Sequence, residues 1–173
     1  MGVQLIIVVE TNKKNQSDWM YIKATIEHFY NYDNAEIKFS PVYMDSKTKY
    51  KDKEAEIRTL ISKYAKSAKG NKSEVIYCFD CDDYDKDPTE RDFLIEAQRY
   101  CNSKDYQFVW FCKDIERVFG GKKVEKNKKR DEAIKFLRKN GIKNIEAGKL
   151  SVSKYRNDSS NILLVLDKYL KRN

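Results

Sequence analysis

The sequence lacks most of the features that mark secreted, membrane-spanning or zinc-binding proteins. Its 173 residues include 1 histidine and 4 cysteines. No apolar run approaches the roughly 20 residues that a membrane-spanning helix requires. The short apolar run that begins at Val3 follows no basic segment, so it does not have the pattern of a secretory signal. These absences predict a soluble, cytoplasmic protein.

The few cysteines and the histidine do not form a recognisable metal-binding pattern. Cys78 and Cys81 make one Cys-x-x-Cys pair, but Cys101 and Cys112 do not supply the second close-spaced pair of a zinc finger. We therefore expect buried free thiols rather than structural zinc. His28 has no partner histidine, which is typical of a surface residue rather than of a metal ligand.

The composition indicates a folded protein with a heavily charged surface. Charged residues make up 36% of the chain and aromatic residues 13%, a mixture that disordered chains do not have. The absence of internal repeats and long linkers predicts a single domain over residues 1–173, with a basic helical part from about residue 120. The formal charge of +8 suits a polyanion or an anionic membrane surface.

Apolar runs and helical patterns alternate along the chain. Nearly continuous apolar, β-branched or aromatic segments predict buried strands at residues 3–9, 74–80 and 106–112, and an alternating segment predicts a strand at 36–44, with Pro41 favouring an edge position. Three- and four-residue spacing predicts helices at residues 17–30, 54–69, 90–101, 114–119, 131–139 and 161–170. Residues 45–53 have the pattern of a polar loop. The alternation predicts an α/β fold with a mostly parallel central sheet flanked by helices.

Carboxylates follow two of the apolar strands at the point where each strand ends. Glu10 follows the first strand, and Asp80, Asp82 and Asp83 follow the strand that begins near Glu74. Because the carboxyl ends of parallel strands lie at one edge of a sheet, we expect these groups to converge there, where α/β proteins bind ligands. Close-packed carboxylates repel one another, and a divalent cation such as Mg²⁺ would relieve the repulsion. An acidic surface loop is the alternative interpretation.

Three short motifs accompany these acids: Ile7-Val8-Val9-Glu10, Ser17-Asp18 leading into Ile22-Lys23-Ala24, and Phe79-Asp80-Cys81-Asp82. Together they resemble the TOPRIM domain, and the resemblance covers roughly residues 3 to 120. Among TOPRIM proteins the chain is most similar to small stand-alone bacterial members, the RloB-like and OLD-type nucleases that are linked to phage defence. A later apolar strand followed by Glu116 is more loosely similar to the RloB-like pattern, and we interpret Glu116 as a surface acid of a helix.

The resemblance implies a TOPRIM-like (Rossmann-like) sheet and a metal-dependent nuclease. In that family the glutamate acts as general acid and base, a role that falls to Glu10, and the Asp-x-Asp binds Mg²⁺ or Mn²⁺, a role that falls to Asp80 and Asp82. Asp83 would hold a second metal or a water. The implied substrate is DNA or RNA. Stand-alone members often work beside an ATPase, and this chain has no Gly-x-x-x-x-Gly-Lys-Ser/Thr motif, so that ATPase would be a separate subunit.

Two other interpretations remain open from the sequence. The family usually has glycine after its glutamate, and Thr11 stands there in this chain. That departure is compatible with a nucleic-acid-binding or regulatory module that has a degenerate site. The Asp-x-Asp also resembles haloacid-dehalogenase-type phosphatases, but their motif has threonine or valine where this chain has Tyr84, and it opens the fold. The phosphatase interpretation also leaves Glu10 without a role.

A dense basic segment follows Gly120-Gly121. A like-charge run is often only a solvated surface, but next to an acidic catalytic edge it could hold a phosphate backbone. We therefore expect a nucleic-acid-binding segment formed by Lys122, Lys123, Lys126, Lys128, Lys129 and Arg130.

Overall fold

Five strands form the central sheet of the computed structural model, which describes all residues 1–173. The strand order is β3-β1-β4-β5-β6, and the first four strands run parallel to their neighbours while β6 is antiparallel to β5. This confirms the predicted α/β class with a mostly parallel sheet, and it places the strand that contains Pro41 at an edge. The strands are β1 (Val3–Val9), β3 (Ile37–Tyr43), β4 (Lys72–Asp80), β5 (Gln107–Cys112) and β6 (Ser159–Ser160).

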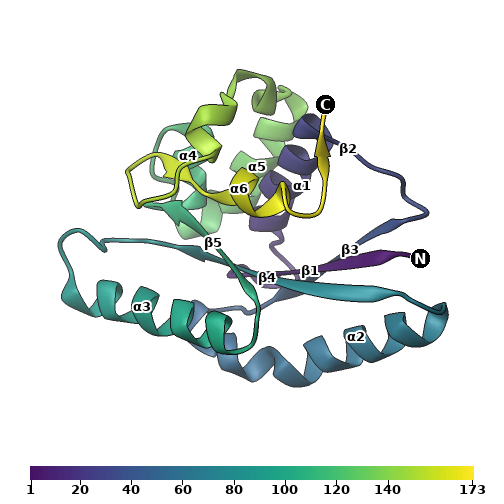
Figure 1. Ribbon diagram of the computed structural model, residues 1–173. Helices are drawn as coiled ribbons and strands as arrows, with labels where there is room; N and C mark the ends of the chain where they lie inside the picture. Colours follow the sequence, from purple (N-terminus) through teal and green to yellow (C-terminus); the bar gives the residue numbers. More distant parts are fainter.

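Helices cover both faces of the sheet and make three layers (Figure 1). One face carries α2 (Glu54–Ser67) and α3 (Pro88–Ser103). The opposite face carries α1 (Ser17–Phe29), α4 (Ile115–Gly120), α5 (Lys129–Arg138) and α6 (Ile162–Leu166). None of these helices combines the length and the apolar character needed to cross a lipid bilayer.

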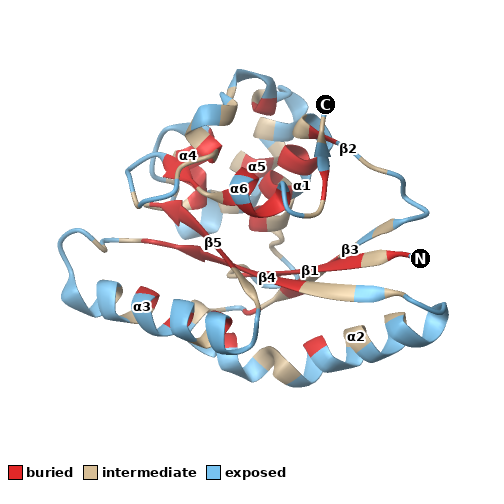
Figure 2. Ribbon diagram, in the orientation of Figure 1, coloured by how far each residue is buried: buried red, intermediate tan, exposed pale blue.

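The two faces of β1 explain why this strand is apolar from Leu5 to Val9. Side chains alternate along a strand, so Ile6 and Val8 pack into the core beneath α2 and α3, while Leu5, Ile7 and Val9 pack into the core beneath α1. All five are almost completely buried. Figure 2 shows the same pattern in the whole molecule, with buried residues concentrated in the sheet and exposed residues on the outer sides of the helices. A strand buried on both faces needs a continuous apolar sequence.

Several short elements differ from the sequence-based expectation. The predicted loop at residues 45–53 contains a 3₁₀ helix, η1 (Lys47–Lys53), whose first turn is capped by the Ser46 side chain. The final helix is shorter than predicted because the chain turns after Leu166 and forms β7 (Lys171–Arg172), which pairs with β2 (Tyr30–Asn31). Short 3₁₀ turns occupy the basic and irregular segments, namely η2 (Lys126–Lys128), η3 (Gly141–Asn144) and η4 (Ala147–Leu150).

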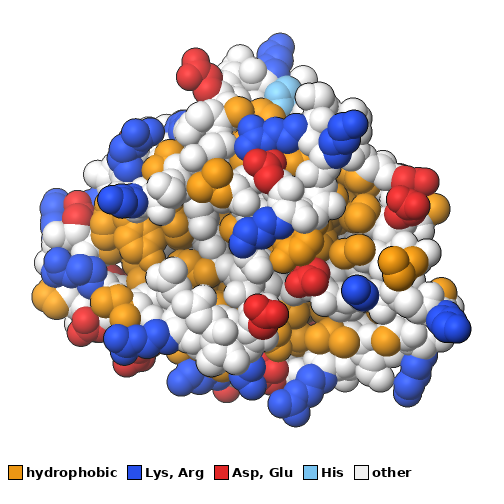
Figure 3. All heavy atoms as spheres, in the orientation of Figure 1, with side chains coloured by type: hydrophobic (Ala, Val, Ile, Leu, Met, Phe, Trp, Pro, Cys, Tyr) orange, Lys and Arg blue, Asp and Glu red, His pale blue; other side chains and the backbone are white.

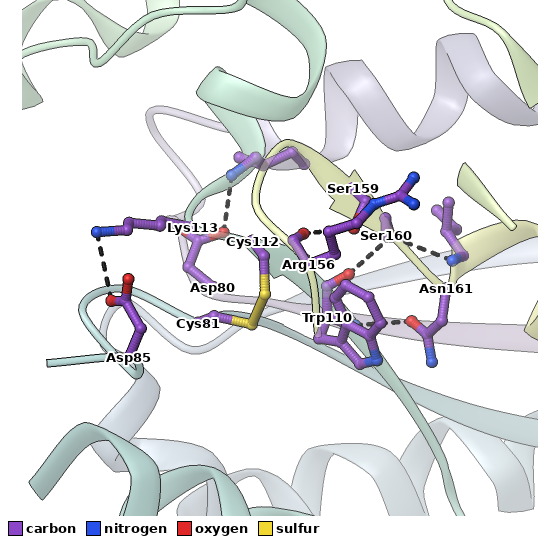
Figure 4. The surroundings of a disulfide bond; sticks show 12 residues. Asp80, Cys81, Asp85, Trp110, Cys112, Lys113, Arg156, Ser159, Ser160 and Asn161 are labelled. Atoms are coloured by element: carbon purple, nitrogen blue, oxygen red, sulfur yellow. Dashed lines mark hydrogen bonds and ion pairs between the residues drawn. A yellow bond between two sulfur atoms is a disulfide. The ribbon is translucent and has the colours of Figure 1, made fainter. Parts of the chain in front are cut away.

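The expectation of free thiols is correct for two cysteines and wrong for the other two. Cys78 and Cys101 are free and buried. Cys81, which follows β4, and Cys112, the last residue of β5, form a disulfide (Figure 4). Their Cα atoms lie 5.0 Å apart although 31 residues separate them in sequence. The pairing follows from the adjacency of two parallel strands, which cysteine spacing alone does not reveal.

Candidate active site

The carboxyl ends of β1 and β4 bring Glu10 and Asp80 together. The two strands are parallel neighbours, with Val8 opposite Tyr77. Glu10 Oε2 accepts a hydrogen bond of 2.5 Å from the backbone N–H of Asp80. The sequence-based prediction that these two acids converge on one edge of the sheet is therefore confirmed.

A polar cavity of about 400 Å³ opens at this edge. It is lined by 12 residues, none of which is hydrophobic. Such a lining suits an ionic or strongly hydrated ligand better than an apolar one. The lining residues come from the loops after β1, β3 and β4, from the start of α1, and from the basic segment: Glu10, Thr11, Asn12, Asn15, Asp18, Asp45, Ser46, Lys47, Asp80, Asp82, Lys126 and Lys129.

Asp80 is fixed in place by the segment that follows β5. The residue is only 8% exposed, and its Oδ1 accepts a hydrogen bond of 2.9 Å from the backbone N–H of Ile115, the first residue of α4. Asp114 caps the same helix by accepting a hydrogen bond from the backbone N–H of Arg117. One Asp80 oxygen is thus held by α4, and the carboxylate as a whole lines the cavity.

Asp82 lines the cavity and is paired with a lysine. Its backbone is in the left-handed region, at φ 49°. Lys47 Nζ donates a hydrogen bond of 2.5 Å to Asp82 Oδ2 and also contacts Glu90 at the start of α3. Sequence reasoning missed Lys47, because a single lysine in a polar loop carries no local signal.

Asp83 does not join the other carboxylates. It is outside the cavity lining, its side chain is 67% exposed, and its Oδ1 lies 3.4 Å from Lys113 Nζ. The same lysine contacts Asp85 Oδ1 at 3.4 Å, a contact drawn in Figure 4. The structure therefore places Asp83 in a surface ion-pair group that holds the loop after β4. It does not support the expected role of Asp83 as a metal ligand.

Three further charged groups extend the site toward α5. Asp18, on the first turn of α1, is 6% exposed and accepts a hydrogen bond from the backbone N–H of Thr11. Glu116 is 1% exposed and forms an ion pair of 3.4 Å with Lys129. The interpretation of Glu116 as a surface acid is therefore wrong. Its burial arises because α4 packs against α1 and α5, an arrangement that the local sequence does not encode.

The buried acids favour their protonated forms. Burial raises the pKa of Glu10 to about 8, an effect that the nearby carboxylates of Asp18 and Asp82 reinforce and that the backbone N–H of Asp80 and Lys47 oppose. Burial likewise raises the pKa of Asp18 to about 6 and that of Glu116 to about 7, with Lys129 opposing both shifts. The pKa of Asp80 is raised by burial and then by Glu10. Burial is the main cause of each shift, and repulsion between neighbouring carboxylates adds to it, a repulsion that a bound cation would reduce.

The donor set fits a hard divalent cation bound by a few carboxylate oxygens and water. Backbone N–H groups hold one oxygen of Glu10 and one of Asp80, which leaves each carboxylate a second oxygen. Asp82 contributes a third carboxylate to the same cavity. No three His, Cys, Asp or Glu side chains are close enough together to coordinate one metal ion by themselves. Mg²⁺ commonly uses one or two carboxylates and keeps several waters, so this chemistry does not require such a group.

The predicted basic segment divides into two parts. Lys129 and Lys126 line the cavity, and Arg130 donates hydrogen bonds to the backbone carbonyls of Lys14 and Asn15. The remaining members, Lys122, Lys123 and Lys128, are exposed to solvent and lie outside the cavity lining. Lysine and arginine side chains are scattered over the face of the molecule shown in Figure 3 and form no single patch there.

The fold and this cavity define an α/β protein with a mostly parallel sheet and a carboxylate-rich site at the carboxyl edge of two adjacent strands. Comparison with protein-family models, with curated proteins and with solved structures gives no match for the chain.

Proposed function

We propose that the protein is a magnesium-dependent nuclease that hydrolyses nucleic-acid phosphodiesters at a TOPRIM-like site. The observation that carries the proposal is the meeting of Glu10 and Asp80 at the carboxyl ends of adjacent parallel strands, inside a wholly polar cavity. This is the arrangement that the TOPRIM resemblance requires of its glutamate and its Asp-x-Asp. Asp82 completes the carboxylate set in the same cavity.

Each acid has a distinct role in this proposal. Asp80 and Asp82 would hold Mg²⁺, which would neutralise charge on the phosphate and lower the pKa of a bound water. Glu10 is the proton-transfer residue, because its carboxylate lies at the cavity and the backbone N–H of Asp80 fixes its orientation. Orientation by a backbone group keeps the reacting oxygen in place while the substrate binds.

Positive charge in and around the cavity supports a phosphate-containing substrate. Lys47, Lys126 and Lys129 contribute to the lining, and Lys122, Lys123 and Lys128 extend the charge outward. Lysine contacts to phosphate act as point charges and do not read bases, so the proposed binding is independent of sequence. The proposed substrate class is therefore nucleic acid, DNA or RNA, bound through its phosphate backbone.

Thr11 supports a second candidate, a nucleic-acid-binding module without catalysis. Its side-chain hydroxyl is buried without a hydrogen-bond partner, and the residue lines the cavity where the TOPRIM family usually has glycine. A side chain at this position limits how closely a phosphate can approach the backbone. The two candidates share the binding surface and differ in turnover.

A cleavage assay with matched carboxylate variants tests the proposal. Purified protein is incubated with labelled single- and double-stranded DNA and RNA, in Mg²⁺ or Mn²⁺ and in excess chelator. We expect metal-dependent cleavage that Asp80→Asn and Asp82→Asn abolish. Asp83→Asn is the control, because it removes an adjacent charge outside the cavity, and it should retain activity. Salt-sensitive binding without cleavage would instead favour the non-catalytic module.

A further inference from the structure

Lys47 is the cation most closely associated with the Asp-x-Asp segment. Its side chain is 16% exposed, and its ammonium contacts Asp82 Oδ2 at 2.5 Å. It lies 4.9 Å from the centre of the Phe93 ring, which adds a cation–π contact. The capped start of η1 fixes its backbone. This environment distinguishes Lys47 from Lys49 and Lys51, which are exposed to solvent in the same 3₁₀ helix.

The Lys47 ammonium contacts two carboxylates, one inside the cavity lining and one outside it. Asp82 lines the cavity, whereas Glu90 lies outside the lining, on the first turn of α3. Lys47 can therefore release Asp82 and still keep a negatively charged partner. Nearby charge also favours the ammonium form of Lys47, because the hydrogen bonds that it donates to Asp82 and Glu90 and the charge of Glu10 raise its pKa despite burial.

We propose that Lys47 is an internal counter-ion that competes with the divalent cation for Asp82. Without metal its ammonium neutralises Asp82, and when metal takes Asp82 the ammonium is held by Glu90. The inference rests on the proposed function in one respect, namely that a divalent cation binds at Asp80 and Asp82. It goes further in naming the residue pair that sets the metal affinity of the site.

The proposed competition predicts the direction in which substitution of Lys47 or of Glu90 changes the affinity for the divalent cation. Removing the ammonium leaves Asp82 without its cation and makes the cavity more negative, so a divalent cation should bind more tightly. Removing the charge of Glu90 takes away the alternative partner, so Lys47 stays on Asp82 and the divalent cation should bind more weakly. A residue that only positioned Asp82 for the metal would behave differently, because its loss would weaken binding.

Binding of Mn²⁺ to the purified protein tests this inference without measuring turnover. Free Mn²⁺ is counted by electron paramagnetic resonance during titration of wild type, Lys47→Met and Glu90→Gln. We expect Lys47→Met to lower the dissociation constant by about tenfold, the scale of removing one competing charge at partly screened contact distance. Glu90→Gln should raise it. Lys51 is an exposed lysine in the same 3₁₀ helix, so Lys51→Met is the control. It removes an equal charge and should leave the dissociation constant for Mn²⁺ unchanged.

The outcomes separate this inference from the proposed function. Weaker or unchanged binding in Lys47→Met, or unchanged or tighter binding in Glu90→Gln, overturns the counter-ion role even if the wild type binds Mn²⁺ and cleaves nucleic acid. If the wild type binds no Mn²⁺, the proposed metal-dependent function fails. In that case, the counter-ion role is still supported if Lys47→Met binds Mn²⁺ and the double variant Lys47→Met/Asp82→Asn does not. If neither variant binds Mn²⁺, the counter-ion role is overturned.

Discussion

The carboxylate of Glu10 accepts a hydrogen bond from the backbone N–H of Asp80, which is 70 residues further along the chain. This contact joins the ends of β1 and β4 and fixes the orientation of the proposed proton-transfer group. Glu10 therefore has two separable properties: it accepts this hydrogen bond, and it can transfer a proton. The amide of a glutamine at this position could accept the same hydrogen bond but could not transfer the proton. Substitutions at this position can therefore test structure and catalysis independently.

Glu10→Gln should abolish turnover while it preserves the fold. We expect nuclease activity to fall by roughly 10²–10⁴-fold, the usual contribution of general acid–base catalysis. Some metal should still bind, because Asp80 and Asp82 are unchanged. Glu10→Ala is the informative comparison, since it leaves the Asp80 N–H without an acceptor and should lower the free energy of unfolding by about 1–3 kcal/mol. Equal activity in wild type and Glu10→Gln would remove Glu10 from the mechanism.

The stability of the protein should depend on the ionisation of Glu116. Burial raises its pKa to about 7 from an ordinary value of 4.5, so the folded chain binds this proton more tightly than the unfolded chain does. The contribution of Glu116 to stability therefore increases as the pH falls from about 7 toward 4.5. Glu116→Gln should be more stable than wild type at pH 8, by roughly 1–3 kcal/mol, and the difference should shrink by about pH 5.

Urea unfolding at several pH values measures this dependence. Glu125→Gln, which removes an equal charge from an exposed position, is the control and should shift stability little at any pH. If Glu116→Gln were less stable than wild type at pH 8, the ion pair with Lys129 would outweigh the cost of burying the carboxylate.

The stability of the β5–β6 edge of the sheet should depend on Asn161. Its Oδ1 accepts a hydrogen bond of 2.9 Å from the Trp110 backbone N–H, and its Nδ2 donates one of 2.9 Å to the Phe108 carbonyl, so the amide extends β6 along β5. Asn161→Ala would leave both backbone groups without these partners. We expect a loss of about 1–3 kcal/mol in the free energy of unfolding, measured by denaturant titration. Asn102→Ala, at an exposed position in α3, should change it far less.

Features that depend on local pattern could be predicted from the sequence. The apolar runs that end at Val9 and Asp80 give two buried strands, and their shared direction follows from the alternation with helices, so the meeting of Glu10 and Asp80 could be predicted. The disulfide, the burial of Glu116 and the pairing of Lys47 could not. Each of them joins elements distant in sequence, and no periodicity or spacing records which loops lie side by side.

The basic segment shows the same limit. Its composition predicted one uniform role, but three of its members have intramolecular partners in the structure, including Lys122, which lies 3.8 Å from Glu132. Lys129 neutralises buried Glu116, and Arg130 holds the loop after β1. Joint neutralisation of Lys128, Lys129 and Arg130 would therefore combine loss of binding with loss of structure.

A cleaner test neutralises only exposed members of the segment. Lys123, Lys126 and Lys128 make no ion pair and are exposed, so replacing all three with Gln should leave the unfolding transition unchanged. If each contacts a phosphate, nucleic-acid affinity should fall and the slope of log K against log salt should become less steep by roughly 2–3. Lys129→Gln alone should instead destabilise the fold, because Glu116 loses its partner. An unchanged salt slope in the triple variant would identify this part of the segment as solvated surface.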